Sequence, residues 1–206
     1  MDVFRAVILG IVQGLSEPLP ISSSAHLLLL PWILNWPVHS LTFDVALHGG
    51  TALAILVYFW RDWLELIGAF FASLRDRSLS GDYHRRLVWY IVVASIPAAL
   101  AGLLFGSTIE DILREPVIVA PLLMIMGIVL LIADRTSSHS RSLSEIRLSD
   151  AVIIGLAQTL ALVPGVSRSG ITITMGLFRQ MNRADAARFS FLMSGPIVMG
   201  LSLIHI

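Results

Sequence analysis

The chain of 206 residues contains no cysteine, no lysine and few charged side chains of any kind. Without cysteine it can form no disulfide and has no thiol chemistry. Charged residues make up 14% of the chain and apolar residues 56%, whereas soluble domains average about 25% charged. This composition excludes a soluble globular enzyme, a disordered chain and a disulfide scaffold. The formal net charge is zero, which argues against a nucleic-acid partner. A polytopic all-α membrane protein remains.

Two apolar runs have the length of a transmembrane helix, which needs about 20 apolar residues. They are residues 87–106 and 117–133. A third run, residues 45–60, ends in a cluster of Trp and charged residues, and the sequence allows it to continue as one long helix to residue 74. These segments form the predicted spanning part of the fold.

Four further apolar stretches are too short to span: residues 3–16, 25–36, 151–163 and 170–178. A helix of 12–14 residues is only about 18–21 Å long. The first two stretches flank a Pro- and Ser-rich break, and the last two flank a break of Pro, Gly and Ser. Irregular backbone at membrane depth is tolerated only where it lines a cavity or is buried in protein. The pattern therefore predicts two re-entrant helical hairpins.

The two hairpins resemble each other in sequence. A shift of 145 residues aligns Ala6, Val7, Ile8, Gly10, Gln13, Leu15, Ser22 and Ser24 with Ala151, Val152, Ile153, Gly155, Gln158, Leu160, Ser167 and Ser169. We therefore expect an internal duplication within a single membrane domain, with residues 1–149 as the first repeat and 150–206 as an incomplete second one. By repeat symmetry, about a quarter of the fold is expected to be missing, and it stays open whether residues 201–206 are native.

The arginine distribution predicts the orientation of the chain. Residues 61–86 hold five Arg and residues 134–150 hold three, whereas residues 107–116, expected to be a loop, hold one Arg beside three acidic residues. The positive-inside rule places the first two segments in the cytoplasm and the third outside. The first hairpin then enters from outside and the second from the cytoplasm. The repeats are predicted to be inverted, with their tips near the midplane, where such folds hold their site.

The first hairpin carries the candidate acidic and nucleophilic groups. Glu17 lies in an apolar surrounding, one helical turn after Gln13, and a charge at bilayer depth costs about 2.5–3.5 kcal/mol on insertion scales. A carboxylate in this position points to function, although pairing with an Arg for folding alone is the alternative. Ser22, Ser23 and Ser24 precede a helix that needs one hydroxyl as its cap, so spare hydroxyls remain. His26 follows, and its imidazole is either a buried structural group or a proton carrier.

The second hairpin carries the candidate anion site. Arg168 stands between Ser167 and Ser169 at the start of a helix, with Thr172 one turn later and Gly165 before it. Free N–H groups, hydroxyls and a guanidinium form a typical phosphate cradle. The alternative is an Arg that extends to the membrane interface. Outside the hairpins, Asp44, His48 and Thr51 begin the third apolar helix near the same side, where a supporting role is open.

Two motifs carry a family resemblance: Gln13 through Glu17 followed by the serines and His26, and Pro164-Gly-Val-Ser-Arg-Ser-Gly-Ile-Thr172. Together they resemble the undecaprenyl-diphosphatase family of the bacitracin-resistance type. The resemblance implies an integral membrane enzyme with inverted repeats. Its reaction removes the terminal phosphate of undecaprenyl diphosphate and so recycles the carrier lipid for peptidoglycan and other wall polymers.

The resemblance also implies roles for residues. Glu17, His26, Ser23 and Arg168 are expected to be catalytic, with Ser23 or a neighbouring serine, or else water, as the nucleophile. The expected substrate-binding residues are Ser22, Ser24, Ser167, Ser169, Thr172 and Gly165. A divalent cation, Mg²⁺ or Ca²⁺, is expected on Glu17 and Gln13, although Gln13 stands where the family often has Glu.

The expected surroundings follow from the same resemblance. The chain is expected to cross the bacterial inner membrane several times, with the site reached from the outer face. Its expected partners are a prenyl diphosphate lipid as substrate and the lipid bilayer, and no nucleic acid. A homodimer is left open. Two other classes remain: a transporter or lipid flippase, because inverted repeats with broken helices are typical of transporters, and an intramembrane Ser/His protease.

Overall fold

A computed structural model describes residues 3–37, 40–113 and 115–204. Within these ranges the chain is helical, with one isolated bridge between Arg141 and Met181 and no β-strand. The elements are α1 (Val3–Ser16), α2 (Ser23–Ile33), α3 (Leu41–Tyr58), α4 (Trp60–Asp76), α5 (Tyr83–Leu113), α6 (Pro116–Thr136), η1 (Leu143–Glu145), α7 (Leu148–Gln158), η2 (Thr159–Leu162), α8 (Arg168–Phe178) and α9 (Arg183–Ile204).

The long apolar runs form long helices, as predicted. Tyr83–Phe105 within α5 and the whole of α6 are each long and apolar enough to cross a membrane. The prediction of one long helix from residue 45 to residue 74 is wrong, because the chain bends by 76° between α3 and α4. The loop expected at residues 107–116 is also wrong for the most part, since α5 continues to Leu113. A glycine such as Gly106 weakens a helix by only about 1 kcal/mol and need not end it.

The short apolar stretches are short helices. The predicted segment 3–16 matches α1, and 151–163 corresponds to α7 followed by η2. Proline explains where they end: Pro18 and Pro164 lack an amide hydrogen, and each disfavours the helical conformation for the residue before it. The next helices begin at serine caps, Ser22 for α2 and Ser167 for α8. Each break is therefore encoded locally by a proline stop and a serine start.

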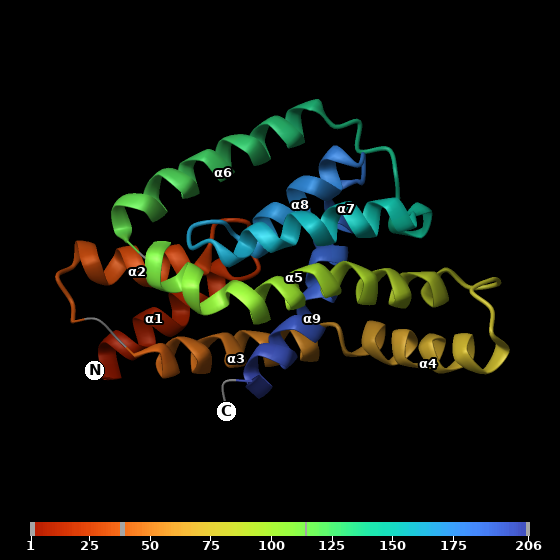
Figure 1. The fold of residues 1–206 in the computed structure, drawn as a ribbon, viewed down its shortest axis with the longest axis horizontal. Helices are drawn as coiled ribbons and strands as arrows, with labels where there is room; N and C mark the ends of the chain where they lie inside the picture. Colours follow the sequence, from red (N-terminus) through yellow and green to blue (C-terminus); the bar gives the residue numbers. More distant parts are fainter. Residues whose placement is uncertain (1–2, 38–39, 114, 205–206) are drawn as a thin grey trace.

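The core lies where α5, α7, α8 and α9 meet (Figure 1). Its most buried members include Ala94, Ile154, Leu177 and Phe189. Gly155 allows the backbones of α7 and α5 to lie close together, because a methyl group on it would lie 2.5 Å from the backbone oxygen of Ala94. No other residue type fits α7 this tightly against α5.

The outer surface is apolar to a degree that a water-exposed protein avoids. On α1, the exposed side chains include Val3, Phe4, Val7, Ile11 and Leu15. Large exposed apolar side chains also follow one another along α5 and α6. Large contiguous apolar surface marks a membrane or partner contact, and with the spans above it identifies the chain as a membrane protein.

A group of polar contacts holds the C-terminal end of α8. Asp150 is completely buried and accepts hydrogen bonds from Arg141 Nη2 at 2.7 Å and Arg179 Nε at 2.6 Å. The segment around Arg141 pairs with the α8–α9 turn, where Arg141 N donates to Gln180 O and Asn182 N donates to Arg141 O. The sequence analysis did not predict this clamp, which holds α8 against α7 and the α6–α7 connection.

Candidate active site

The two breaks meet in the structure. Arg168 Nη2 donates to Glu17 Oε1 at 2.7 Å, although 151 residues separate the two side chains. The Ser169 hydroxyl lies 3.3 Å from the backbone oxygen of Glu17 and 3.0 Å from that of Leu19. Both charged side chains are largely buried, with 10% of Glu17 and 18% of Arg168 exposed. The segment that carries Glu17 and the segment that carries Arg168 are therefore in direct contact.

The Glu17 carboxylate is surrounded by polar groups from four helices, α1, α2, α3 and α8. Its Oε2 accepts a hydrogen bond from the Ser23 hydroxyl and one from Gln13 Nε2 at 3.1 Å. Gln13 Nε2 also lies 3.3 Å from Thr51 Oγ1 on α3, and His48 Nε2 on the same helix is 3.7 Å from Oε2. The structure therefore brings together Gln13, Glu17, Ser23 and Arg168, which the sequence analysis singled out, and adds His48 and Thr51, whose role it left open.

The serines divide into two kinds. Ser22 Oγ accepts from Ala25 N at 3.4 Å, and Ser167 Oγ accepts from Gly170 N at 3.0 Å, so both are helix caps. Each is also paired with the serine two positions later, Ser24 at 3.2 Å and Ser169 at 3.1 Å. Ser23 alone of the first three donates to the Glu17 carboxylate. Of these serines, Ser23 has the geometry of an activated nucleophile.

The remaining predicted residues lie around this centre. Gly165 adopts a φ of 95° in the break before α8, and a side chain there would lie 2.8 Å from the backbone oxygen of Val119 on α6. Thr172 is buried, and its hydroxyl contacts Arg168 O and Ser190 Oγ on α9. This hydroxyl therefore links the first turn of α8 to α9. The sequence analysis did not identify Ser190, and no motif marks it.

His26 is oriented by its own helix. Its Nδ1 lies 2.8 Å from the backbone oxygen of Ser22. A carbonyl oxygen can only accept, so Nδ1 carries the proton and Nε2 of the neutral ring presents a lone pair. The ring hydrogen-bonds Ser22 and not Glu17, which leaves Nε2 able to take a proton from another group.

Two buried polar atoms at the site have no hydrogen-bond partner among the residues that the structure describes: Arg168 Nη1 and Gln13 Oε1. Buried polar groups are nearly always satisfied, so each unsatisfied one calls for an explanation. A guanidinium N–H at the first turn of α8 would be satisfied by an anion, and a phosphate fits both the donor and the helix end. An amide oxygen beside a carboxylate would be satisfied by a donor or a cation.

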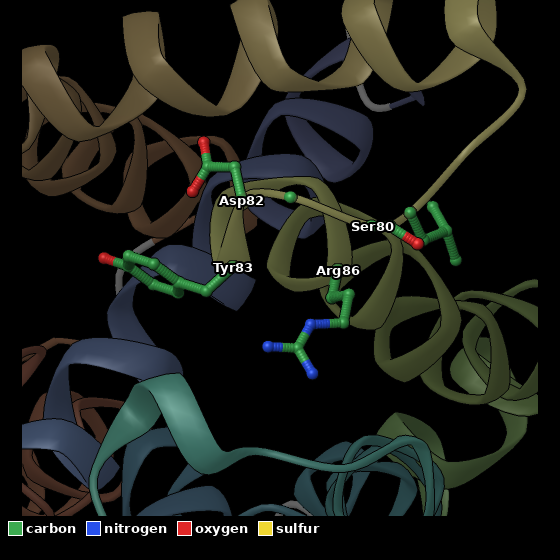
Figure 2. Close-up of a pocket in the computed structure, with 6 residues that line it drawn as sticks. Ser80, Asp82, Tyr83 and Arg86 are labelled. Atoms are coloured by element: carbon green, nitrogen blue, oxygen red, sulfur yellow. The ribbon is translucent and has the colours of Figure 1, made fainter.

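The pocket drawn in Figure 2 lies elsewhere. It has a volume of about 380 Å³ and is lined by residues of the α4–α5 connection and the first turn of α5, namely Leu79, Ser80, Gly81, Asp82, Tyr83 and Arg86. None of the residues around Glu17 contributes to it. The polar centre formed by the two breaks, rather than this pocket, is the candidate active site.

Comparison with known proteins gives a consistent result. The family model of the bacitracin resistance protein BacA matches residues 6–206. The undecaprenyl-diphosphatase of Moorella thermoacetica is 51% identical over 206 residues, which cover all of this chain and 77% of that protein. The undecaprenyl-diphosphatases of Geotalea daltonii and Gemmatimonas aurantiaca are 52% and 50% identical, over 100% and 99% of this chain and 76% of each relative. The chain thus spans about three quarters of the length of these relatives.

Proposed function

The chain belongs to the bacitracin resistance protein BacA family, and we infer from this premise that it hydrolyses undecaprenyl diphosphate to undecaprenyl phosphate and inorganic phosphate. The product is the carrier lipid of cell-wall synthesis, and bacitracin resistance is the associated property. The single observation that carries the inference in the structure is the Glu17–Arg168 pair, which joins a carboxylate, a hydroxyl and an anion-binding helix end inside an apolar fold. The relatives' names favour this enzyme over a transporter.

The site supports the following division of work. Arg168 Nη1 and the first turn of α8 bind the diphosphate and stabilise the charge that develops during phosphoryl transfer. Ser23 Oγ attacks the terminal phosphorus while its proton passes to Glu17 Oε2, and the bond from phosphorus to the bridging oxygen breaks. Undecaprenyl phosphate leaves with that oxygen. His26 Nε2 then takes a proton from the water that releases phosphate from Ser23. Attack by water in the first step is the alternative route.

A divalent cation fits the donors only in part. Among the described residues, no three His, Cys, Asp or Glu side chains converge on one point where an ion could be held. Mg²⁺ is nevertheless often held by one or two carboxylates and the phosphates of the substrate. Glu17 and the unsatisfied Oε1 of Gln13 would hold the ion. It would supply positive charge against the phosphate oxygens.

The proposed fold is an inverted repeat with two re-entrant hairpins. Its support is the register of the two breaks, since the caps of α2 and α8, Ser22 and Ser167, are 145 residues apart, the same shift that aligns the sequences. The proposed location is the bacterial inner membrane, with the site open to the outer face. Its support is the position of the α4–α5 connection, which with the adjoining helix ends holds Arg75, Arg77, Arg85 and Arg86. This connection lies at the opposite end of the molecule from α1 and α2 (Figure 1).

Phosphate release tests the function directly. Purified protein in detergent, supplied with undecaprenyl diphosphate or a C15 prenyl diphosphate and Mg²⁺ or Ca²⁺, is expected to release one phosphate per lipid. The Glu17→Gln variant, purified in the same way, is the control. Lipid movement between leaflets of a vesicle without phosphate release would overturn the proposal in favour of a flippase.

A further inference from the structure

His48 on α3 faces the same carboxylate oxygen that contacts Ser23. The Ser23 hydroxyl donates to Glu17 Oε2, and His48 Nε2 lies 3.7 Å from this atom. His48 Nδ1 lies 2.8 Å from the backbone oxygen of Asp44. Since a carbonyl oxygen only accepts, Nδ1 carries the proton, and Nε2 of the neutral ring presents a lone pair. Glu17 Oε2 therefore has a hydroxyl donor on one side and an imidazole acceptor on the other.

The separation between His48 and Glu17 is too long for a hydrogen bond. It is 3.7 Å, whereas a hydrogen bond spans about 2.7–3.2 Å, and two acceptors have no proton to share. This changes when Glu17 Oε2 takes up a proton, because a protonated carboxyl group is a donor. A movement of about 0.8 Å then brings the donor and the acceptor within hydrogen-bond distance. Only the protonated form of Glu17 gains a partner in His48.

The proposed reaction places a proton on this oxygen. As Ser23 Oγ bonds to the terminal phosphorus and the bond from phosphorus to the bridging oxygen breaks, the Ser23 proton passes to Glu17 Oε2. When water attacks the phosphoserine, Ser23 Oγ leaves phosphorus and takes this proton back, while a proton of the water passes to His26 Nε2. Glu17 is therefore protonated for the whole lifetime of the intermediate.

The other groups around the carboxylate suit its charged form. Gln13, Ser23 and Arg168 all donate to it, whereas His48 presents an acceptor. A carboxyl proton on Oε2 needs an acceptor of its own, since a buried donor without a partner costs about 1–3 kcal/mol. His48 Nε2 is placed to be that acceptor.

We propose that His48 is a positioning residue that stabilises the protonated form of Glu17 between the two steps, by accepting a hydrogen bond from Oε2 at Nε2. This proposal rests on the proposed function, which puts the proton on Glu17. The bond from Nδ1 to the Asp44 carbonyl keeps the lone pair of Nε2 directed at Glu17. Because the new hydrogen bond forms only as the proton moves, His48 contributes to kcat and not to substrate binding.

Two substitutions of His48 test this role by steady-state phosphate release from a prenyl diphosphate in detergent. His48→Leu removes the acceptor, so kcat should fall about tenfold while KM stays within about twofold of wild type. His48→Gln keeps an acceptor, because the amide oxygen can take the place of Nε2, and its kcat should stay within about threefold. His84→Leu is the control, since His84 contacts Asp82 away from the site, and it should match wild type.

A second measurement needs no turnover. In protein labelled with ¹⁵N at histidine, nuclear magnetic resonance distinguishes protonated from unprotonated ring nitrogens. The signals that disappear in His48→Gln belong to His48. They should show a protonated Nδ1 and an unprotonated Nε2, as the contact with Asp44 requires. His48→Ala replaces His48→Leu in the kinetic test if the Leu variant does not give a monodisperse preparation.

Three results would overturn the proposal. The first is a kcat of His48→Leu equal to that of the wild type. The second is a His48→Gln variant as slow as His48→Leu, which would mean that the imidazole itself carries the proton away. The third is a ring protonated at both nitrogens, which would make His48 an ion-pair partner of the resting carboxylate. A wild type that releases no phosphate would instead refute the proposed function, and the role of His48 with it.

Discussion

The two breaks that form the site use the same backbone device for opposite chemical purposes. Each consists of a proline stop, a serine cap and a second serine paired with the cap; the two serines are in the same register, 145 residues apart, whereas Pro18 and Pro164 are 146 residues apart. The position that holds Ser23 in the first break holds Arg168 in the second, and the position of Glu17 corresponds to Leu162. One break therefore holds a carboxylate and a hydroxyl that contacts it, and the other holds the guanidinium that pairs with this carboxylate. Under the proposed function, the difference at these two positions is what gives the two similar breaks complementary groups.

The two breaks also differ in their surroundings. The helix before the first break, α1, exposes a row of apolar side chains, whereas α8 after the second break is buried along most of its length. Gln13 contacts Glu17 and Thr51, but its counterpart Gln158 reaches only the backbone oxygen of Ala94, at 3.4 Å. The α8 helix is thus enclosed by protein, while α1 presents apolar side chains on the outer surface.

The largest difference between the two breaks is expected from the substitution Glu17→Gln. The amide keeps the shape of the side chain but cannot accept the Ser23 proton or balance Arg168, so phosphate release should fall by at least about 10³-fold. Leu162→Met, at the equivalent position of the second break, is the matched control and should stay near wild type. Steady-state phosphate release measures both, and activity of Glu17→Gln within threefold of wild type would remove its assigned role.

Arg168→Lys should be almost as damaging as Arg168→Ala. A guanidinium can grip a phosphate with two parallel hydrogen bonds, whereas an ammonium is a point charge. We expect kcat/KM to fall by 10²-fold or more in both variants, roughly 3 kcal/mol. Arg183→Lys is the control, because Arg183 pairs with Asp134 at a more exposed position. Near-wild-type kinetics of Arg168→Lys would mean that this break contributes charge only.

His26→Ala should lower kcat by about 10²-fold, the usual effect of removing a general acid or base. His84→Ala provides the comparison, since His84 contacts Asp82 in the α4–α5 connection, away from the site. If kcat of His26→Ala matches that of His84→Ala, then His26 has only a structural role on α2.

The smallest expected loss of activity is that of Gln13→Leu, and Gln158→Leu, at the equivalent position of the second break, is its matched control. The first removes a contact to Glu17 and should lower kcat/KM by roughly tenfold, with Tm nearly unchanged. The second removes one long hydrogen bond and a buried oxygen without a partner, so activity should stay within twofold and Tm should not fall. Equal losses of activity in the two variants would show that both breaks act on the substrate in the same way.

The sequence predicts those parts of the molecule whose causes are local. Long apolar runs gave α5 and α6, and the prolines and serines gave the ends of α1 and the starts of α2 and α8. The bend between α3 and α4 has no local cause of this kind, because no proline or glycine stands at Phe59; there the ring of Phe59 lies 6.0 Å from that of Phe191 on α9. The Asp150 clamp depends in the same way on contacts between distant segments.

The residues of the candidate site also divide into those with a local signal in the sequence and those whose position depends on packing. Glu17, Ser23 and Arg168 could be predicted because ionic and hydroxyl groups in apolar breaks are unusual in themselves. His48 could not be assigned a role, because its distance to Glu17 depends on how α3 packs against α1. The hydrogen bond between Thr172 and Ser190 could not be predicted either, since it joins α8 to α9 and no pattern in either helix requires it.

The Asp150 clamp has a consequence for the order in which the protein is assembled. The contacts that tie the α6–α7 connection to the end of α8, such as Ser137 Oγ to Leu177 O, close loops of about 40 residues, whereas Glu17 and Arg168 are 151 residues apart. For flexible chains the longer closure costs about 1 kcal/mol more. During synthesis, Glu17 enters the membrane long before its arginine exists, and α8 can be fixed against α7 as soon as the α8–α9 turn is made. We therefore expect the contact between Glu17 and Arg168 to close after α8 is fixed against α7, so that the Glu17 carboxylate is paired with its arginine only in that last step.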